Sequence, residues 1–219
     1  MKPATLPLTL AALTFAATHA AAQVENMGPK AATYITDADV KKVNALPGVD
    51  RQIVSVDIGK LNEAVGIVHR GKLMAPAGGA SAAPPVTPPG QAAATPCGLP
   101  APDASAPNNG TGISHDHQTE TYLIVSGSGT LVTGGQIAAG RRSAPDSAVT
   151  TTLNGPSCSG RIVGDDVVKR VVNVGDIIII PAGVAHGWAE IPDHVDYLTV
   201  RPDPDRVLKP YVHPVLQKK

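Results

Sequence analysis

The sequence has little aromatic character and no excess of charge of either sign. Only 3% of its 219 residues are Phe, Trp or Tyr, and 18 Lys and Arg residues balance 18 Asp and Glu residues. A balanced chain lacks the positive surface that nucleic acids or anionic membranes attract, so neither is expected as a partner. With so few aromatic residues, the core must consist of Val, Ile, Leu and Ala, which favours β-strands.

Several catalytic motifs are also absent. The chain contains no Gly-x-Ser-x-Gly nucleophile elbow and no Walker-type phosphate loop. Gly127-Ser128-Gly129 begins like a dinucleotide-binding fingerprint, but Val132 stands where the third glycine belongs and no helical pattern follows. These absences exclude serine hydrolases of the elbow type and nucleotide-dependent enzymes.

Long hydrophobic runs are missing apart from one at the N-terminus. Met1-Lys2 gives a basic start, residues 6–17 are mostly apolar, and Ala20-Ala21-Ala22 places small residues before Gln23. This pattern predicts a signal peptide over residues 1–22 and an exported protein, periplasmic or secreted. The alternative is a membrane anchor, but the apolar run is too short for the roughly 30 Å of a bilayer core. No membrane span is expected in the rest of the chain.

Cysteine is scarce, with Cys97 and Cys158 as the only two. An exported chain meets an oxidising compartment, which favours one disulfide between them. A cross-link closing such a loop would stabilise the fold by roughly 4 kcal/mol in the chain-entropy treatment. Two unpaired thiols are the alternative, because sequence spacing does not establish proximity.

The remaining pattern predicts an all-β domain with a few additions. Residues 23–50 form an N-terminal extension, in which Thr36 and Asp39 supply a capping box for a helix over 37–46. A barrel over 51–205 follows, and residues 206–219 form a C-terminal tail. Residues 74–110 are rich in Pro and Ala and are expected as a long inserted loop, and 138–160 as a second irregular stretch. Short β-rich runs are predicted as strands at 52–58, 64–69, 121–125, 130–132, 161–163, 167–174, 176–180, 185–188 and 197–201.

Two segments carry the residues suited to chemistry. One contains His115, His117 and Glu120, and the other ends in His186. Residues two apart in a strand share a face, so His115 and His117 are expected to point inward together. Three imidazoles and one carboxylate suit a divalent ion of Fe, Mn, Zn, Ni or Cu and leave open positions for water or substrate.

In both segments the chain resembles the cupin superfamily. The first cupin motif has His-x-His, then Glu, then six residues and Gly, and Glu120 to Gly127 fits that last spacing. The second motif is Gly, five residues, Pro-x-Gly, two residues and His; Gly175, Pro181, Gly183 and His186 all match. The resemblance covers residues 53–201. It implies a double-stranded β-helix, or jelly-roll barrel, with one metal ion inside.

One spacing departs from this pattern. Cupins usually place three or four residues between the second histidine and the glutamate, whereas His117 and Glu120 are separated by two. In a regular strand Glu120 would then face away from His117, unless a β-bulge restores its direction. The alternatives are therefore a three-histidine, one-glutamate site and a site with three histidines alone.

The expected ligand is a small organic molecule held inside the barrel. Tyr122 and Trp188 lie near the ligand strands and are predicted to line the cavity, with core packing as the alternative. Arg70 and Arg201 end strands and are candidates to bind an anionic substrate at the mouth, or else solvated strand ends. The resemblance implies oxygenase, isomerase or lyase chemistry, with a non-catalytic ligand-binding protein as the alternative. A homodimer is the expected assembly.

Overall fold

The computed structural model describes residues 29, 31–74, 95–102, 107 and 109–217. The predicted signal peptide at 1–22 and most of the predicted insertion at 74–110 lie outside these residues. Within the described part of the chain, no helix has the length and apolar character needed to span a membrane.

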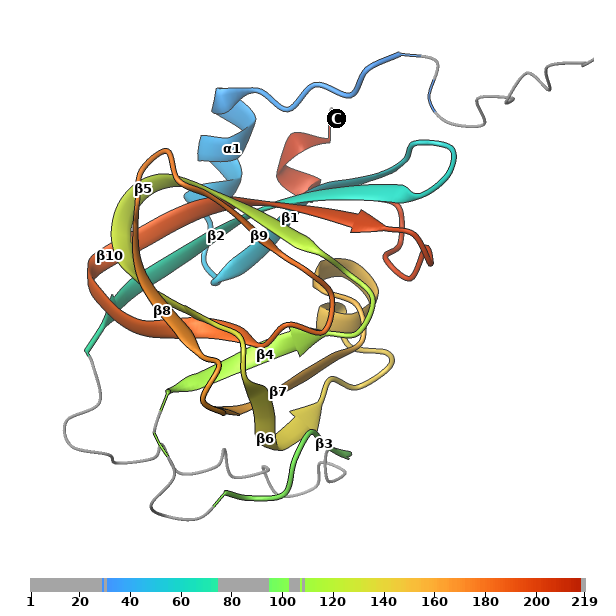
Figure 1. Ribbon diagram of the computed structural model, residues 1–219. Coiled ribbons are helices and arrows are strands. Elements are labelled where there is room, and N and C mark those ends of the chain that lie inside the picture. Colours follow the sequence, from blue (N-terminus) through green and yellow to red (C-terminus); the bar gives the residue numbers. More distant parts are fainter. Residues whose placement is uncertain (1–28, 30, 75–94, 103–106, 108, 218–219) are drawn as a thin grey trace, which may run out of the picture.

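Helix α1 covers Asp37–Asn44 and begins with the predicted capping box. The Thr36 hydroxyl accepts a hydrogen bond from the backbone N–H of Asp39, and the Asp39 carboxylate accepts one from the backbone N–H of Thr36. The helix ends two residues earlier than predicted, before Pro47-Gly48. Val43 is fully buried and packs with Ile53 and Ile67 of the neighbouring strands, so the helix lies against the outside of the sheet (Figure 1).

The rest of the structure is built almost entirely from antiparallel strands, as predicted. Beyond them the described residues form a π-helical turn at Val149–Leu153 and a 3-10 helix at Pro214–Leu216. The strands are β1 Asp50–Asp57, β2 Asn62–Leu73, β3 Pro96–Cys97, β4 Thr111–His115, β5 Glu120–Thr133, β6 Gln136–Arg142, β7 Ser157–Val163, β8 Val168–Asn173, β9 Ile177–Ile180, β10 His186–Asp203 and β11 Tyr211–Val212.

Two long bent strands, β5 and β10, form the frame of the barrel. They pair with each other along most of their length. The second half of β10 pairs with β2 while the first half of β5 pairs with β9, so that one face has the order β11-β1-β2-β10-β5-β9. The first half of β10 pairs with β4 and the second half of β5 with β8, giving the other face β3-β6-β7-β4-β10-β5-β8. The two faces enclose an interior in the manner of a jelly roll (Figure 1).

The bend in β5 explains why the sequence pattern suggested two separate strands. Gly127 adopts a φ of +68°, and a Cβ at this position would lie 2.0 Å from the His194 carbonyl oxygen. The Ser126-Gly127-Ser128-Gly129 segment is therefore a bend inside one continuous strand, and the predicted break is wrong. The same holds for β10, which continues through the region between the predicted strands at 185–188 and 197–201.

The stretch predicted to be irregular at 138–160 is partly strand. It contains most of β6 and the first residues of β7, which pair with each other across the intervening π-helical turn. Burial alternates imperfectly along β6, and a register shift interrupts its pairing with β7 after Ala138. The short period-2 signal of a strand is therefore weak in the sequence. At the other end of the chain, β11 lies in the predicted tail and extends the sheet beside β1.

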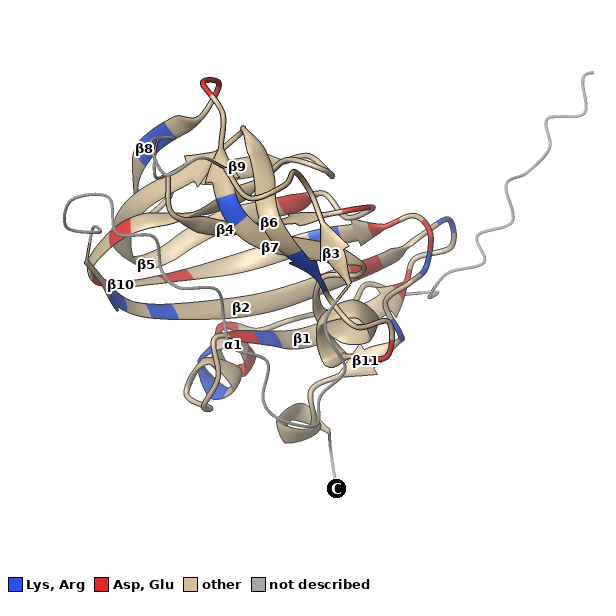
Figure 2. Ribbon diagram, turned by 90° about the horizontal axis from the view of Figure 1, so that it is seen from below, with Lys and Arg blue, Asp and Glu red and all other residues tan. Residues whose placement is uncertain are grey.

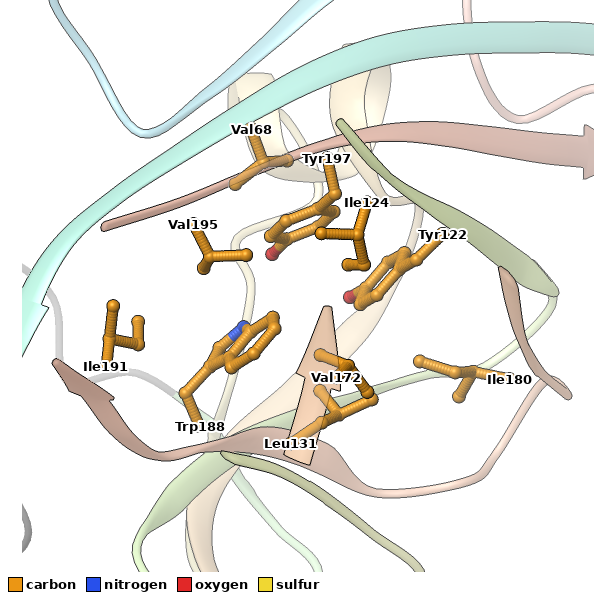
Figure 3. Packing of buried hydrophobic residues seen from close by; sticks show 10 residues of the cluster. All are labelled: Val68, Tyr122, Ile124, Leu131, Val172, Ile180, Trp188, Ile191, Val195 and Tyr197. Atoms are coloured by element: carbon orange, nitrogen blue, oxygen red, sulfur yellow. The ribbon is translucent and has the colours of Figure 1, made fainter. Parts of the chain in front are cut away.

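The barrel interior holds the main hydrophobic core. Its residues come from both faces of the barrel and point toward one another (Figure 3). They are Val68, Tyr122, Ile124, Leu131, Val172, Ile180, Trp188, Ile191, Val195 and Tyr197. Outside this core, charged residues of both signs are interspersed over the strands and loops (Figure 2).

Candidate metal centre

Three of the predicted ligands meet inside the barrel, and each stands at one end of a strand. His115 is the last residue of β4, Glu120 the first of β5 and His186 the first of β10. All three side chains are at least 97% buried. Strand β4 pairs with β10 so that Ile113 lies opposite His186, and the backbone N–H of Gly183 donates to the His115 carbonyl oxygen at 2.7 Å. The second motif is thus tied directly to the first.

The ligand atoms converge on a small volume. One carboxylate oxygen of Glu120, Oε2, lies 3.3 Å from His115 Nε2 and 3.2 Å from His186 Nε2. The candidate ligand atoms of the three residues all lie within 4.8 Å of one another. Ligands held about 2.1 Å from one ion lie roughly 3.0–3.4 Å apart at octahedral or tetrahedral angles, so the two distances from Glu120 to the histidines match a shared ion.

The hydrogen-bond network assigns the tautomer of both histidines. His186 Nδ1 lies 3.0 Å from the Val184 carbonyl oxygen, which can only accept, so Nδ1 carries the proton. His115 Nδ1 lies 2.8 Å from the Ser157 hydroxyl oxygen. That hydroxyl donates its own proton to the Gly155 carbonyl oxygen at 2.9 Å, so it can only accept from His115. Nδ1 of His115 therefore donates to Ser157. In the neutral form of each ring, Nε2 then carries the lone pair with which imidazole binds a metal.

This arrangement fits a cation. Both Nε2 atoms are buried and have no hydrogen-bond donor facing them in the described structure. They point instead toward a carboxylate oxygen, which is also an acceptor. With both rings neutral, these three electron-rich atoms would repel one another, whereas a divalent ion between them satisfies all three. Burial lowers the pKa of His115, which further favours its neutral, metal-binding form.

Arg201 keeps Glu120 ionised. Burial alone would raise the pKa of the Glu120 carboxyl, but the charge of Arg201 lowers it to well below its ordinary value. Arg201 Nε donates to Glu120 Oε1 at 2.5 Å, and another guanidinium nitrogen donates to Asp50 at 2.7 Å. Tyr122 donates its hydroxyl proton to Glu120 Oε2 at 2.8 Å. One carboxylate oxygen is therefore committed to Arg201, and the other faces the histidines.

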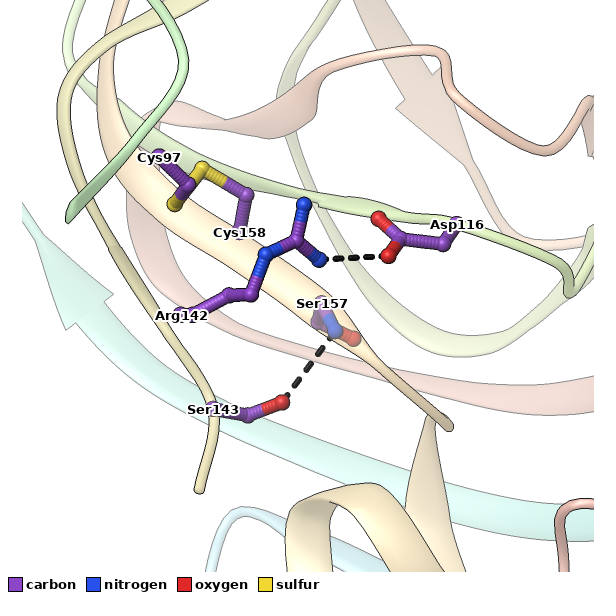
Figure 4. Close-up of a disulfide and its surroundings, with 6 residues drawn as sticks. All are labelled: Cys97, Asp116, Arg142, Ser143, Ser157 and Cys158. Carbon is purple, nitrogen blue, oxygen red and sulfur yellow. Dashed lines mark hydrogen bonds and ion pairs between the residues drawn. A yellow bond between two sulfur atoms is a disulfide. The ribbon is translucent and has the colours of Figure 1, made fainter. Parts of the chain in front are cut away.

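The predicted fourth ligand, His117, is not part of the cluster, and its assignment is corrected. Strand β4 ends at His115, so the two-residue alternation on which the prediction relied does not apply. The turn is fixed by the Asp116 backbone N–H, which donates to the Pro156 carbonyl oxygen at 2.9 Å, and by an ion pair between Asp116 and Arg142 (Figure 4). The His117 side chain is 47% exposed and pairs with Asp205 at 2.7 Å.

The same observation resolves the question about Glu120. Four residues separate His115 from Glu120, which lies within the usual cupin spacing. His115 thus occupies the position of the motif's second histidine, and Ile113 occupies the position of the first. The cluster has two histidines and one glutamate, and no β-bulge is needed to bring Glu120 inward.

A cavity of about 560 Å³ opens beside the cluster, and all four predicted substrate-binding residues line it. The Tyr122 and Trp188 rings lie close to Tyr197, at centroid distances of 4.3 and 5.7 Å (Figure 3). Arg70 lies in the same cavity and donates from Nε to the Tyr197 hydroxyl at 3.1 Å. Arg201 is only 1% exposed and is engaged by Glu120 and Asp50, so its main contact is with the cluster.

Three residues of this site were not anticipated in these roles. Asp50 and Ser157 hold Arg201 and His115 in place, and Ile113 faces His186 across the strand pair. The position of Ile113 could have been found by counting four residues back from Glu120 to His115. Asp50 and Ser157 carry no motif, so no sequence signal pointed to them.

The predicted disulfide is present in the structure. Cys97 of β3 and Cys158 of β7 are joined, with their Cα atoms 6.0 Å apart (Figure 4). Cys158 lies directly after Ser157, the residue that holds His115. The cross-link therefore fastens the edge of the sheet that supports the metal centre.

No family model and no curated protein sequence matches the chain. Among solved structures, it is similar to the DMSP lyase DddQ from Ruegeria pomeroyi DSS-3, at 13% identity and a TM-score of 0.31 over 71% of this chain and 45% of that one. A double-stranded beta-helix protein from Klebsiella pneumoniae gives 14% identity and 0.36 over 80% and 94%. An oxalate oxidase gives 15% and 0.31 over 74% and 55%. The chain thus spans about half the length of DddQ and of the oxalate oxidase.

These likenesses are too weak to support a statement about activity. The fold is identified from the strand order itself. The chain forms an antiparallel jelly-roll barrel, and residues of the two motifs meet in its interior. That is the fold of the cupin superfamily, and the resemblance noted in the sequence is confirmed at the level of the fold.

Proposed function

We propose that this protein is an exported, metal-dependent cupin that binds a small organic molecule in its barrel and acts on it. His115, Glu120 and His186 would hold one divalent ion. The observation that carries the proposal is the convergence of two buried imidazole nitrogens and one carboxylate oxygen beside a 560 Å³ cavity. Cavities of this size suit ligands of ordinary metabolite dimensions.

The donor set bears on which ion is bound. Two histidines and one carboxylate with open positions are typical of non-haem Fe(II) oxygenases, and the same atoms also suit Mn, Zn, Ni and Cu. Such an ion supplies Lewis-acid polarisation of a bound substrate oxygen or, if redox-active, a site for oxygen chemistry. Three protein ligands leave room for a substrate atom and for water.

The surrounding side chains orient the cluster and shield it. Ser157 and the Val184 carbonyl hold the two imidazole rings, and Arg201 holds one oxygen of Glu120. Burial raises the pKa of Tyr122, so its hydroxyl stays protonated and remains a hydrogen-bond donor to Glu120. The rings of Tyr122, Trp188 and Tyr197 exclude water from one side of the cavity.

The test is the metal content of three matched proteins. The purified wild-type chain, the His186→Gln variant and the His117→Gln variant are incubated with Fe(II), Mn, Zn, Ni or Cu, desalted, and measured by elemental analysis. We expect about one equivalent in the wild type and in His117→Gln, and at least a tenfold lower affinity in His186→Gln. Failure of the wild type to retain any of the five ions would refute the proposal, as would equal loss in the two variants.

Turnover separates catalysis from binding alone. Oxygen uptake with phenolic and keto-acid substrates by the metal-loaded protein supports an enzyme. Retention of a ligand without turnover supports the alternative, a non-catalytic ligand-binding cupin. Loss of uptake in His186→Gln but not in His117→Gln would assign the activity to this centre.

Export and dimerisation belong to the same proposal. The Cys97–Cys158 disulfide is consistent with an oxidising compartment and so supports export. Mass spectrometry of the chain recovered from the periplasm or medium should show an N-terminus at Gln23, and recovery of the chain only inside the cell with Met1 intact would contradict export. Sedimentation at micromolar concentration should show a homodimer, and a monomer would contradict it.

A further inference from the structure

Arg70 faces the cavity with part of its guanidinium unused. It follows Val68 by two residues on β2 and therefore lies on the same, inward face of that strand. Val68 is buried in the core, whereas Arg70 is exposed at the mouth of the barrel. Its Nε donates to the Tyr197 hydroxyl at 3.1 Å. In the described part of the chain, its two terminal nitrogens have no hydrogen-bond partner.

The other arginine of the cavity differs in this respect. Arg201 is fully buried and pairs with both Glu120 and Asp50. These are also the two carboxylates that line the cavity. One guanidinium thus faces two carboxylates, which leaves a charge of −1, and Arg70, the other arginine of the cavity, brings this sum to zero. A divalent ion at the cluster would make the cavity positive, so the metal-loaded cavity favours an anionic ligand.

Arg70 is also held in a geometry suited to one kind of anion. A guanidinium offers parallel N–H groups that match the two oxygens of a carboxylate. The bond from Nε to Tyr197 restrains the group, because the Tyr197 ring is 99% buried and packed against Tyr122. A restrained donor loses less conformational entropy when a ligand binds.

The walls of the cavity indicate what the rest of the ligand is like. The whole chain has four tyrosines, one tryptophan and one phenylalanine. Two of the tyrosines and the tryptophan line this one cavity, at Tyr122, Tyr197 and Trp188. Such a concentration of rings in a chain poor in aromatic residues favours a ligand with an aromatic or flat apolar body.

We propose that the barrel takes a small carboxylic acid with an aromatic or apolar body, and that Arg70 binds the carboxylate. The body of the ligand lies against the rings of Tyr122, Trp188 and Tyr197, and its far end reaches the metal centre. The placement of that far end rests on the proposed function, whereas recognition of the carboxylate depends on Arg70 alone.

The test compares matched acids and amides. Benzoate and phenylacetate are titrated against benzamide and phenylacetamide, and binding is followed by calorimetry and by the fluorescence of Trp188, the chain's only tryptophan. Proteins are the wild type, Arg70→Gln, Arg70→Lys and the control Arg170→Gln, whose side chain is exposed on β8. Each is measured in the zinc-loaded and the chelated state, and zinc content is determined on the same samples.

We expect the wild type and Arg170→Gln to bind the acids at least tenfold more tightly than the amides. Arg70→Gln should lose at least tenfold in affinity for the acids without a change for the amides, and Arg70→Lys should fall between the two. A wild type that does not distinguish acid from amide overturns the proposal. So does a zinc-loaded Arg70→Gln protein that keeps the full preference, because the ion would then be the anion-binding group. A wild type that prefers acids but binds none of the five ions tested above refutes the metal centre and leaves the role of Arg70 standing.

Discussion

Replacing Arg201 with methionine should strongly destabilise the barrel. The substitution keeps much of the side chain's apolar volume but removes the charge that faces Glu120 and Asp50. Glu120 is 2% exposed and Asp50 18% exposed, so neither carboxylate can recover its hydration fully. Removing one partner of a buried ion pair costs about 3–5 kcal/mol, a large part of the roughly 5–15 kcal/mol that keeps a domain folded.

The assay is urea unfolding in the presence of EDTA, so that no bound metal contributes to stability. Trp188 is 6% exposed, and its fluorescence will report the loss of the core. A double-mutant cycle with Glu120→Gln separates the ion pair from other effects. In Arg201→Met the Glu120 carboxylate is left buried without its partner, whereas in the double variant residue 120 carries no charge. The two changes should be non-additive by about 1–3 kcal/mol. A cost below about 1 kcal/mol for Arg201→Met, or additivity within about 0.5 kcal/mol, would refute this account of the pair.

The pair also predicts how stability depends on pH. Burial opposes ionisation of Glu120, but Arg201 lowers its pKa in the folded state to well below 4.5, its ordinary value. A carboxyl with a lowered folded pKa stabilises the fold above its unfolded pKa, and this contribution is lost as the pH falls toward the folded value. In EDTA, the wild type should therefore lose stability below about pH 4.5 more steeply than Glu120→Gln. Equal slopes for the two proteins would contradict the assignment.

Three further changes test other parts of the fold. Replacing Cys97 and Cys158 with serine opens a link between residues 61 apart and should lower the free energy of unfolding by about 4 kcal/mol, measured in urea; no change would show that the bond does not constrain the unfolded chain. Gly129→Ala would place a methyl group 2.9 Å from the Trp188 ring and should cost about 1–3 kcal/mol and shift the tryptophan emission; an unchanged spectrum would contradict the contact. Thr36→Ala removes the cap of α1 and should cost about 1 kcal/mol by thermal unfolding, unless the helix contributes nothing to the cooperative unit.

Local patterns predicted the parts of the structure that depend on near neighbours. The capping box at Thr36 needs only residues three apart, and the second motif, from Gly175 to His186, contains the short strand β9 and the turns on either side of it. The β-rich character of the chain follows equally from local composition. The jelly-roll class came from the order and spacing of the two motifs.

The sequence could not show where strands end when the deciding partner is distant. His117 was expected beside His115 because an extended chain was assumed, but Arg142 and Pro156 hold Asp116 in a turn. Those partners are 26 or more residues away from it, and nothing in the His-x-His pattern indicates them. The same reason hid the long bent strand β5, since its bend depends on a close approach to the His194 backbone.

The contacts of Arg201 with Glu120 and Asp50 could not be predicted for a related reason. Arg201 was considered as a substrate-binding residue at a strand end, whereas its partner Asp50 lies 151 residues earlier in the chain. Gly66 helps to make room for it, since a Cβ there would lie 3.3 Å from the guanidinium. The need for a small residue at position 66 follows only from the pairing of β2 with β10, which the sequence pattern does not give.

The ends of three separate strands supply the candidate ligand atoms, so these atoms come together only when the barrel is closed. An ion there would act as a clasp on β4, β5 and β10, and every tenfold rise in its free concentration above the dissociation constant would add about 1.4 kcal/mol to the work of opening the barrel. Scarcity of the ion would then lower the stability of the folded barrel.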